Sequence, residues 1–169
     1  MELVVLVDEQ NNELGTAPKD MVHTQNTPLH RGFSLFLFNK KGELLLTKRA
    51  KHKKTFPGIW TNTVCGHPAP GERAVDAAKR RLKDELGIVV SDVKEVAPYR
   101  YRLADSNGIV ENEICPILIA HVDKDPKSNT DEVGEWRWID WQQFLEDTKK
   151  HPGNYSPWCV EEALKVPRV

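Results

Sequence analysis

The stretch from residue 61 to residue 72 carries side chains that could do chemistry. It sets Cys65 and His67 on either side of Gly66, at the end of a β-rich run, and a Pro/Gly loop then reverses the chain. A charged helical segment follows and carries Glu85 back toward the same stretch. Thiols and carboxylates transfer protons, and imidazoles and carboxylates bind divalent cations. This combination predicts a functional site rather than a linker.

The helical segment after the loop has one face of small and apolar residues. At ~100° per residue this stripe is made of Ala74, Ala78, Leu82 and Leu86. Glu85 falls inside the stripe and Arg81 lies one turn before it, so both point at whatever the helix packs on. A buried i,i+4 ion pair would explain the two charges. A metal ion would explain the inward carboxylate as well, because a buried carboxylate requires a compensating cation.

Five further residues could form a metal centre. Glu111 and Glu113 are two positions apart in a β-type run, so a strand would turn both to one face. Three histidines near turns or strand ends could join them, namely His23, His30 and His67. Three nitrogens and two carboxylates suit a divalent cation better than a structural, cysteine-based zinc site. The alternative is that these polar residues are scattered and that the two glutamates form the solvent face of a hairpin.

The other histidines and the cysteines predict no site by themselves. No acidic or thiol-bearing context singles out three histidines, which are expected to be surface or core residues: His52, His121 and His151. The cysteines are odd in number and widely spaced, at Cys65, Cys115 and Cys159. This spacing speaks against a disulfide framework, so each is expected to be a free thiol.

A cluster of cations precedes the Cys/His stretch. Residues 48–54 contain five Lys or Arg residues and one His. Such a run is ordinarily a solvated loop. Because it leads directly into the stretch described above, it could instead present cations to an anionic ligand.

The elements that must position these residues are short strands and a few helices. Strands are expected at residues 3–7, 32–38, 43–47 and 135–139, with extended chain at 88–90 and 93–103 and one long strand at 109–120. Helical segments are expected at residues 18–23, 74–86 and 141–149, and from an N-cap at Ser156 to Leu164. Mixed strands with helices indicate an α+β or α/β sandwich.

Composition bounds the class of protein. The 169 residues are expected to form one domain with a real core, and 29% of them are charged, with a formal net charge of −1. This balance argues against nucleic acid or an anionic membrane as the main partner. No apolar run reaches the ~18 residues of a membrane span, and the first residues lack a basic signal segment. A cytoplasmic protein is expected.

Part of the helical region resembles the Nudix box. The matching positions are Gly66, Glu72, Arg80, Glu85 and Gly87. Two positions depart from the box, because Arg81 and Asp84 stand where it has glutamates. In Nudix hydrolases that glutamate cluster holds the magnesium ions that assist water attack on a diphosphate. The resemblance therefore implies a poor phosphohydrolase.

The whole chain is similar to the type 1 isopentenyl-diphosphate isomerases. The matching segments occur in the family's order at residues 61–68, 99–102, 108–116, 131–133 and 156–158. The resemblance implies an α+β fold, an α/β/α sandwich of mixed sheets flanked by helices, formed by residues 1–169 as a single domain. It also implies conversion of isopentenyl diphosphate to dimethylallyl diphosphate through a tertiary carbocation, by a monomer or weak dimer.

The resemblance also assigns roles to residues. Cys65 matches the catalytic thiol, and Glu113 the second catalytic residue, with Tyr101 beside it. The ligands of one tightly bound divalent metal (Mn, Zn or Mg) match His23, His30, His67, Glu111 and Glu113. Glu85 matches the ligand of one Mg that arrives with the substrate diphosphate. The diphosphate-contacting cations match Lys19, Arg49, Lys53 and Arg81, and the π face of Trp158 is expected to stabilise the carbocation.

Two other functions compete with this interpretation. A Nudix-type diphosphohydrolase acting on a nucleotide or isoprenoid diphosphate would release phosphate with magnesium, and Arg81→Glu would not harm it. A non-catalytic metal-binding or diphosphate-binding module would bind ligand without turnover. The module gives no explanation for an inward pair of Cys65 and Glu113.

Overall fold

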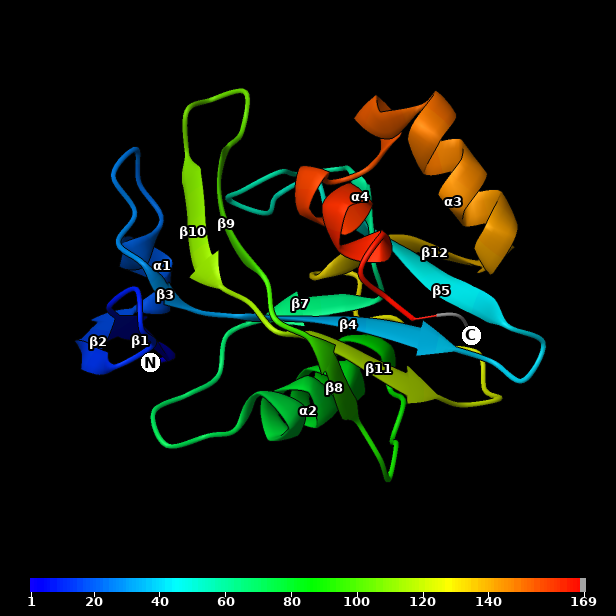
Figure 1. Cartoon of the computed structure of the whole chain (residues 1–169), viewed down its shortest axis with the longest axis horizontal. Coiled ribbons are helices and arrows are strands. Elements are labelled where there is room, and N and C mark those ends of the chain that lie inside the picture. Colours follow the sequence, from blue (N-terminus) through cyan, green and yellow to red (C-terminus); the bar gives the residue numbers. More distant parts are fainter. Residues whose placement is uncertain (168–169) are drawn as a thin grey trace.

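The computed structural model describes residues 1–167 and contains two β-sheets. The smaller sheet has the strand order β2-β1-β3-β10-β9. Its strands are β1 (Leu3–Val7), β2 (Glu13–Pro18), β3 (His30–Arg31), β9 (Arg100–Ala104) and β10 (Val110–Ile114). β3 and β10 run parallel, and the other neighbours are antiparallel. Figure 1 shows this sheet at one end of the molecule, beside the N-terminus.

The larger sheet forms the centre of the molecule. Its order is β12-β5-β4-β11-β8, with β6 paired to β5 and β7 paired to β4. The strands are β4 (Phe33–Phe38), β5 (Glu43–Arg49), β6 (Trp60–Thr61), β7 (Val64–Gly66), β8 (Lys94–Ala97), β11 (Ile117–His121) and β12 (Val133–Asp140). β4 and β11 are parallel, and β7 runs antiparallel to β4.

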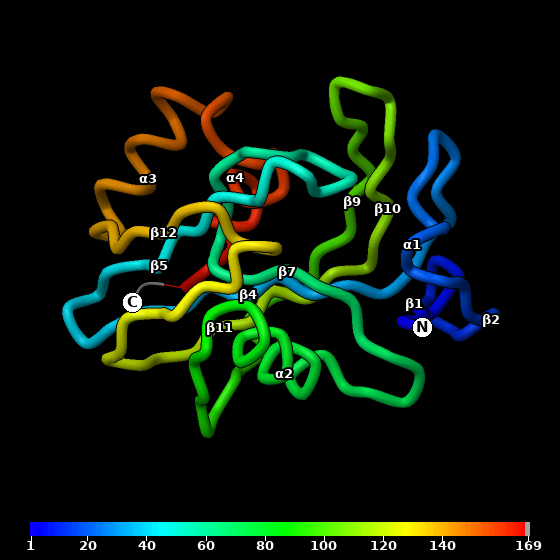
Figure 2. Tube along the Cα trace, turned by 180° about the vertical axis from the view of Figure 1, so that it is seen from behind, coloured from blue at the N-terminus to red at the C-terminus, as the bar shows by residue number. Residues whose placement is uncertain are grey.

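Helices cover both faces of the larger sheet. They are α2 (Ala74–Leu86), α3 (Trp141–Lys150) and α4 (Pro157–Ala163), with a 3-10 turn at Pro152–Asn154, whereas α1 (Lys19–Val22) lies against β1 and β2 of the smaller sheet. The two opposite views place α2 on one side of the sheet and α3 and α4 on the other (Figures 1 and 2). This arrangement confirms the expected sandwich of mixed sheets flanked by helices.

β4 is buried along its whole length because both of its faces are covered. Phe33, Leu35 and Leu37 belong to the apolar cluster that α2 completes, whereas Phe36 and Phe38 belong to the cluster that α3 and α4 complete. This alternation follows from the two-residue period of a strand. Ser34, on the second face, is the polar exception and is fully buried.

The expected long strand at residues 109–120 is wrong. The chain forms β10 and β11, which belong to different sheets, and the break falls at Cys115-Pro116. Pro116 has no N–H to continue a ladder, although its carbonyl accepts a bond from the Ser34 N–H (3.1 Å). β3 and β4 break beside it at Gly32, whose N–H bonds to the Ile114 carbonyl (2.9 Å). Two parallel segments therefore cross together from one sheet to the other.

Other boundaries differ in smaller ways. Residues 88–90 form no strand, and the segment at 93–103 divides into β8 and β9. Ser156 precedes α4 as expected but makes no side-chain cap, because its hydroxyl is hydrogen-bonded to that of Thr61 (2.8 Å). The predicted α2 ends as expected at Gly87, which has a left-handed φ of 64°.

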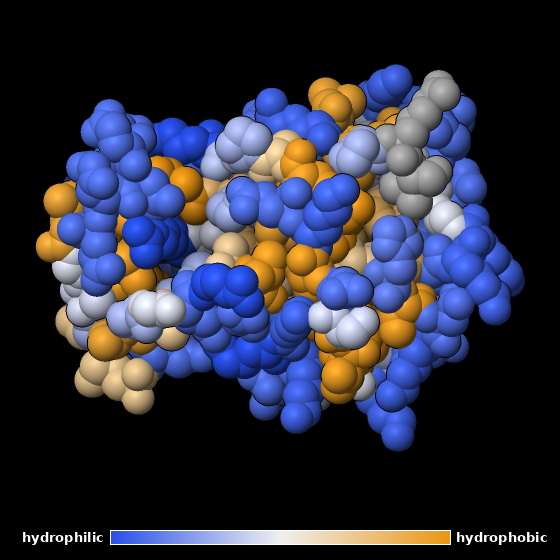
Figure 3. All heavy atoms as spheres, turned by 60° about the horizontal axis from the view of Figure 1, so that its bottom comes forward, coloured by the Kyte–Doolittle hydropathy of each residue, from blue (hydrophilic) through white to orange (hydrophobic). Residues whose placement is uncertain are grey.

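The exterior is mainly polar on the face drawn with all heavy atoms, where hydrophilic residues surround a band of hydrophobic ones (Figure 3). Within residues 1–167, none of the helices has both the length and the apolar character that a membrane crossing requires.

Candidate active site

A cavity of about 570 Å³ brings most of the predicted site residues together. Its wall includes His23, His67, Glu111, Glu113, Cys65, Tyr101, Trp158, Lys19, Arg49, Lys53 and Arg81. Two predicted residues are not part of this wall: His30 is fully buried, and Glu85 lines a smaller adjoining recess with Cys65 and Lys53. His52, which sequence reasoning set aside, also lines the cavity.

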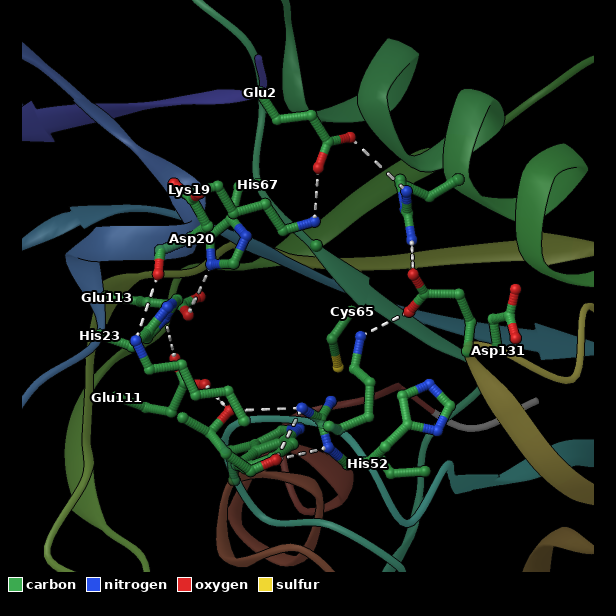
Figure 4. Close-up of a pocket in the computed structure, with 18 of the residues that line it drawn as sticks. Glu2, Lys19, Asp20, His23, His52, Cys65, His67, Glu111, Glu113 and Asp131 are labelled. Carbon is green, nitrogen blue, oxygen red and sulfur yellow. Dashed lines mark hydrogen bonds and ion pairs between the residues drawn. The ribbon is translucent and has the colours of Figure 1, made fainter.

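The three histidines and two glutamates form a compact cluster. They come from the end of α1, from β3, from the residue after β7 and from β10, and one ligand atom of each lies within 4.8 Å of all the others. His23 Nε2 is 3.0 Å from Glu111 Oε2, and the Thr55 hydroxyl donates to Glu111 Oε1 (2.5 Å). His30 Nδ1 lies 2.8 Å from the Pro28 carbonyl oxygen, which leaves Nε2 to face the cluster. The close-up shows His23, His67, Glu111 and Glu113 gathered on one side, with Cys65 apart from them (Figure 4).

The cluster fits a divalent cation. Among the described residues, His30 Nε2 and both ring nitrogens of His67 have no hydrogen-bond partner although they are buried. Burial lowers the pKa of His67 to about 3, so its ring is neutral and able to bind a metal. Burial and the neighbouring Glu111 raise the pKa of Glu113 to about 8. A cation would relieve this repulsion between two carboxylates, and imidazole with carboxylate is a suitable donor set.

Gly32 makes room for Glu113. A Cβ atom at Gly32 would lie 1.7 Å from Glu113 Oε1 and 2.7 Å from its Cδ. The glycine stands at the crossing between the two sheets, one residue after β3, and β3 pairs His30 with Glu113. The absence of a side chain at this position is therefore a requirement of the cluster.

Cys65 is held as a protonated thiol. Its Sγ donates to Asn62 Oδ1 (3.2 Å) and lies 3.7 Å from Ser34 Oγ. Burial, followed by the charge of Glu162, raises the pKa of Cys65 to about 12. The thiol thus carries a proton at neutral pH and can donate it.

Tyr101 and Glu113 are direct partners across the β9–β10 ladder. Burial, and then the charge of Glu113, raises the pKa of Tyr101 well above its usual value, so the phenol is protonated. The Tyr101 ring stacks on Trp158 at a centroid distance of 6.0 Å.

Trp158 is fixed on several sides. Its Nε1 donates to Asn62 Oδ1 (3.3 Å), and Phe56 packs edge-on against its ring at a centroid distance of 5.1 Å. Arg49 Cζ lies 5.6 Å from the ring centroid. The indole already faces one cation, which is consistent with a π face that accepts positive charge.

The predicted diphosphate-contacting cations are bound to acidic or carbonyl oxygens. Lys19 Nζ is 3.0 Å from Glu2 Oε2, and Lys53 Nζ is 2.5 Å from Glu132 Oε2. Arg49 donates to the Thr55 and Phe56 carbonyls.

Arg81 and Glu85 form the i,i+4 ion pair that the helical wheel allowed, at 2.9 Å, with both side chains buried. Arg81 also lies 3.5 Å from Glu132 Oε1 and 3.8 Å from Glu2 Oε1. Burial raises the pKa of Glu85, and Arg81 opposes that rise.

Sequence reasoning missed several residues of the site. Glu2 and Glu132 act as counter-ions, and Thr55 and Asn62 hold Glu111 and Cys65. Glu2 could have been found from the β1–β2 hairpin, in which Leu3 pairs with Pro18 and so sets Glu2 beside Lys19. Asn62 and Thr55 carried no spacing signal.

Comparisons with known proteins show the family to which the chain is similar. The NUDIX domain family matches residues 28–159. A relative from Saccharopolyspora erythraea named isopentenyl-diphosphate Delta-isomerase is 46% identical over 98% of this chain and 86% of its own length. A Corynebacterium glutamicum relative of the same name is 47% identical over 100% of this chain and 92% of its own.

Solved structures support the fold. DR0079 from Deinococcus radiodurans aligns with a TM-score of 0.76 and 18% identity over 96% of this chain and 98% of its own. A MutT NUDIX hydrolase from Burkholderia pseudomallei aligns with a TM-score of 0.63 and 21% identity, over 82% of this chain and 98% of its own.

Proposed function

Because the chain belongs to the isopentenyl-diphosphate Delta-isomerases of the NUDIX family, we propose that its cavity converts isopentenyl diphosphate to dimethylallyl diphosphate. One observation carries the proposal. A protonated thiol and a Tyr101/Glu113 pair line the same cavity, whose wall also carries several cations. Such a cavity suits proton transfer on a small molecule with an anionic tail.

The reaction adds a proton to one carbon of the substrate and removes one from a neighbouring carbon. An acid and a base are therefore needed on opposite faces of a flat alkene. We assign these roles to Cys65 on one wall and to Glu113 with Tyr101 on the other. Because the reaction is reversible, each group serves as acid in one direction and as base in the other.

The intermediate is a tertiary carbocation, which water would trap. Trp158 and Tyr101 give the cavity apolar walls, and Phe56 packs against the Trp158 ring. The π face of a desolvated Trp158 contributes about 2 kcal/mol to stabilising the cation.

Two metal ions belong to the proposal. His23, His30, His67, Glu111 and Glu113 would hold one divalent ion (Mn, Zn or Mg), and Glu85 would bind a Mg that arrives with the diphosphate. When bound, the first ion would supply positive charge beside Glu113, which would favour the ionised form of that carboxyl group. Lys19, Arg49, Lys53 and Arg81 bind the diphosphate tail, which positions the alkene.

Deuterium incorporation from heavy water tests the function. The unmodified protein should place solvent deuterium in dimethylallyl diphosphate and release no phosphate. Cys65→Ala should abolish turnover and keep diphosphate binding, whereas Cys159→Ala removes a buried thiol that does not line the cavity and should retain turnover. Phosphate release, or full turnover by Cys65→Ala, would refute the proposal.

A NUDIX diphosphohydrolase is the second candidate, because the solved structures include hydrolases of this fold. The presence of Arg81 argues against hydrolysis. Its guanidinium group is paired with Glu85, at a position where a hydrolase would use another carboxylate. Arg81→Glu should weaken diphosphate binding by an isomerase and leave a hydrolase unharmed. We further propose that residues 1–169 act as one domain and as a monomer or weak dimer, which light scattering across a concentration series would test.

A further inference from the structure

Thr55 is hydrogen-bonded to residues from two regions of the candidate site. Its side chain is buried, and its exposed fraction is 4%. The hydroxyl donates to Glu111 Oε1 (2.5 Å) and accepts from Arg49 Nη2 (3.3 Å). Glu111 belongs to the cluster of histidines and glutamates, whereas Arg49 is one of the cations proposed to bind the diphosphate. A single hydroxyl therefore connects the two regions of the cavity.

On the side of the cluster, the bond from Thr55 fixes the orientation of Glu111. Thr55 bonds to Oε1, and the other oxygen, Oε2, lies 3.0 Å from His23 Nε2. The carboxylate thus presents one oxygen to the cluster while the hydroxyl holds the other. Groups that hydrogen-bond a metal ligand in this way orient it, and their loss typically lowers metal affinity about 10- to 100-fold. We therefore expect Thr55 to support binding of the divalent ion.

On the side of the diphosphate, Arg49 is fixed by the turn that contains Thr55. Its Nε donates to the carbonyls of Thr55 and Phe56 (3.2 Å each), and its Nη2 donates to the Thr55 carbonyl (2.9 Å). Phe56 has a φ of 45°, a left-handed conformation that is costly for an aromatic residue and requires support from its surroundings. The bonds from Arg49 provide such support, so the guanidinium group and the turn hold each other in place.

Arg49 differs from the other three proposed cations. Lys19, Lys53 and Arg81 are each paired with a carboxylate. Arg49 makes no ion pair within residues 1–167, and its bonds to the turn use only Nε and Nη2. Its Nη1 is left to bind an anion in the cavity, which Arg49 lines. An anion can therefore bind Arg49 without displacing a carboxylate.

We propose that Thr55 is a positioning residue that couples these two regions, so that a divalent ion at the cluster and an anion on Arg49 each strengthen binding of the other. This inference rests on the proposed function, because it concerns a cation assigned to the diphosphate tail. A bound metal ion would fix Glu111, and Glu111 in turn fixes the Thr55 hydroxyl and the guanidinium group bonded to it. The ligand that binds second then has less of the chain to order, and the coupling is reciprocal.

Calorimetry of Mn²⁺ binding to the full chain, freed of metal by a chelator, tests the coupling. Titrations in chloride and in sulfate at equal ionic strength measure how much an anion tightens the metal site. Sulfate is the probe because it binds Mn²⁺ only weakly in solution. In the unmodified protein, sulfate should raise the Mn²⁺ affinity at least about fivefold, the lower end of typical coupling between sites.

Thr55→Val removes the hydroxyl that forms the connection. This variant should bind Mn²⁺ about tenfold more weakly in chloride. It should also lose most of the gain from sulfate and retain only the direct attraction between the two ions. Thr55→Ser keeps the hydroxyl and should retain both the affinity in chloride and the gain in sulfate. Thr148→Val is the matched control, because Thr148 is equally buried and its hydroxyl bonds to the Leu145 carbonyl in α3, so both quantities should stay unchanged.

Arg49→Lys tests the connection from its other end. Within the described residues, Arg49 makes no hydrogen bond to a member of the cluster, so an effect on Mn²⁺ binding in chloride must pass through Thr55. Lysine keeps the charge but cannot make the forked bonds to the turn, and Mn²⁺ affinity should fall about two- to fivefold. The double variant with Thr55→Val should lose no more than Thr55→Val alone.

Four results would each overturn the inference. They are the lack of a gain from sulfate in the unmodified protein, an equal gain in Thr55→Val, a Thr55→Ser as weak as Thr55→Val, and additive losses in the double variant. If Thr55→Val does not fold in a thermal scan, Thr55→Ser and Arg49→Lys still decide, because the first must keep the gain from sulfate and the second must bind Mn²⁺ more weakly in chloride. The titrations require no turnover, so lack of isomerisation would instead overturn the proposed function.

Discussion

Gly32→Ala should separate folding from metal binding in this protein. The added Cβ would lie 1.7 Å from Glu113 Oε1, whereas contacts of a real Cβ essentially never fall below 3.0 Å. The oxygen must therefore retreat by about 1.3 Å, the difference of these two distances. Glu113 is a flexible side chain and can move, but the position it leaves is that of a predicted metal ligand.

Gly32→Ala should have a small effect on folding stability and a large effect on metal affinity. Gly32 is not among the glycines with positive φ, so alanine can adopt its backbone conformation. Replacing such a glycine ordinarily stabilises a protein by about 0.4–1 kcal/mol through the unfolded chain, so the variant should fold normally. Loss of groups that support a metal ligand costs about 10- to 100-fold in metal affinity, and displacing the ligand itself should cost at least the upper value.

Metal-dependent thermal unfolding measures this loss without reference to activity. At a Mn²⁺ concentration of 100 times the dissociation constant, bound metal stabilises the unmodified protein by about 2.7 kcal/mol. A 100-fold weaker site leaves about 0.4 kcal/mol at the same concentration. Gly134→Ala is the matched control, because its nearest neighbour would lie at an ordinary 3.7 Å. An undiminished metal-induced shift in Gly32→Ala would show that Glu113 is not a ligand.

Three further predictions concern charges and aromatic contacts. Glu132→Gln removes the counter-ion of Lys53 and Arg81. In calorimetry without added metal, this variant should bind inorganic diphosphate about two- to fivefold more tightly. Unchanged affinity would mean that these ion pairs do not compete with the ligand. Trp158→Phe weakens the π face and loses the hydrogen bond to Asn62, so kcat should fall about tenfold with little change in KM. A change confined to KM would contradict the role of Trp158 in stabilising the carbocation. The bond to Arg80 lowers the pKa of Glu72, so the stability it contributes is complete above the unfolded value of about 4.3 and is lost as pH falls through the lower folded value. The unfolding free energies of Glu72→Gln and the unmodified protein should therefore differ at pH 6 and converge in strong acid.

Local periodicity was enough to predict the orientation of two pairs of site residues. The helical wheel placed Arg81 and Glu85 on the buried face of α2, where they form an ion pair. The two-residue period of a strand turned Glu111 and Glu113 to one side, and both line the cavity. These predictions succeed because each depends on one element whose period is visible in the sequence.

The parts that failed depend on contacts between elements. Pro116 was a local sign of the break at Cys115-Pro116, but which sheet each half joins is decided by contacts between elements. Glu132 reaches Arg81 because the loop at 127–132 is fixed to the end of α2, where the Asn129 N–H bonds to the Glu85 carbonyl (2.7 Å).

The paired crossing of β3–β4 and β10–β11 limits how substrate can enter. The two segments are hydrogen-bonded to each other in both sheets and also at Gly32 and Pro116. Two paired strands therefore connect the sheets, and a hinge motion between the sheets would have to bend both of them. Separation of the two sheets would break these backbone hydrogen bonds and disrupt the cluster of histidines and glutamates. We therefore expect substrate to enter past the loops that line the cavity at residues 52–55 and 131–132. Crosslinking these two loops should block entry of substrate while leaving the metal centre intact.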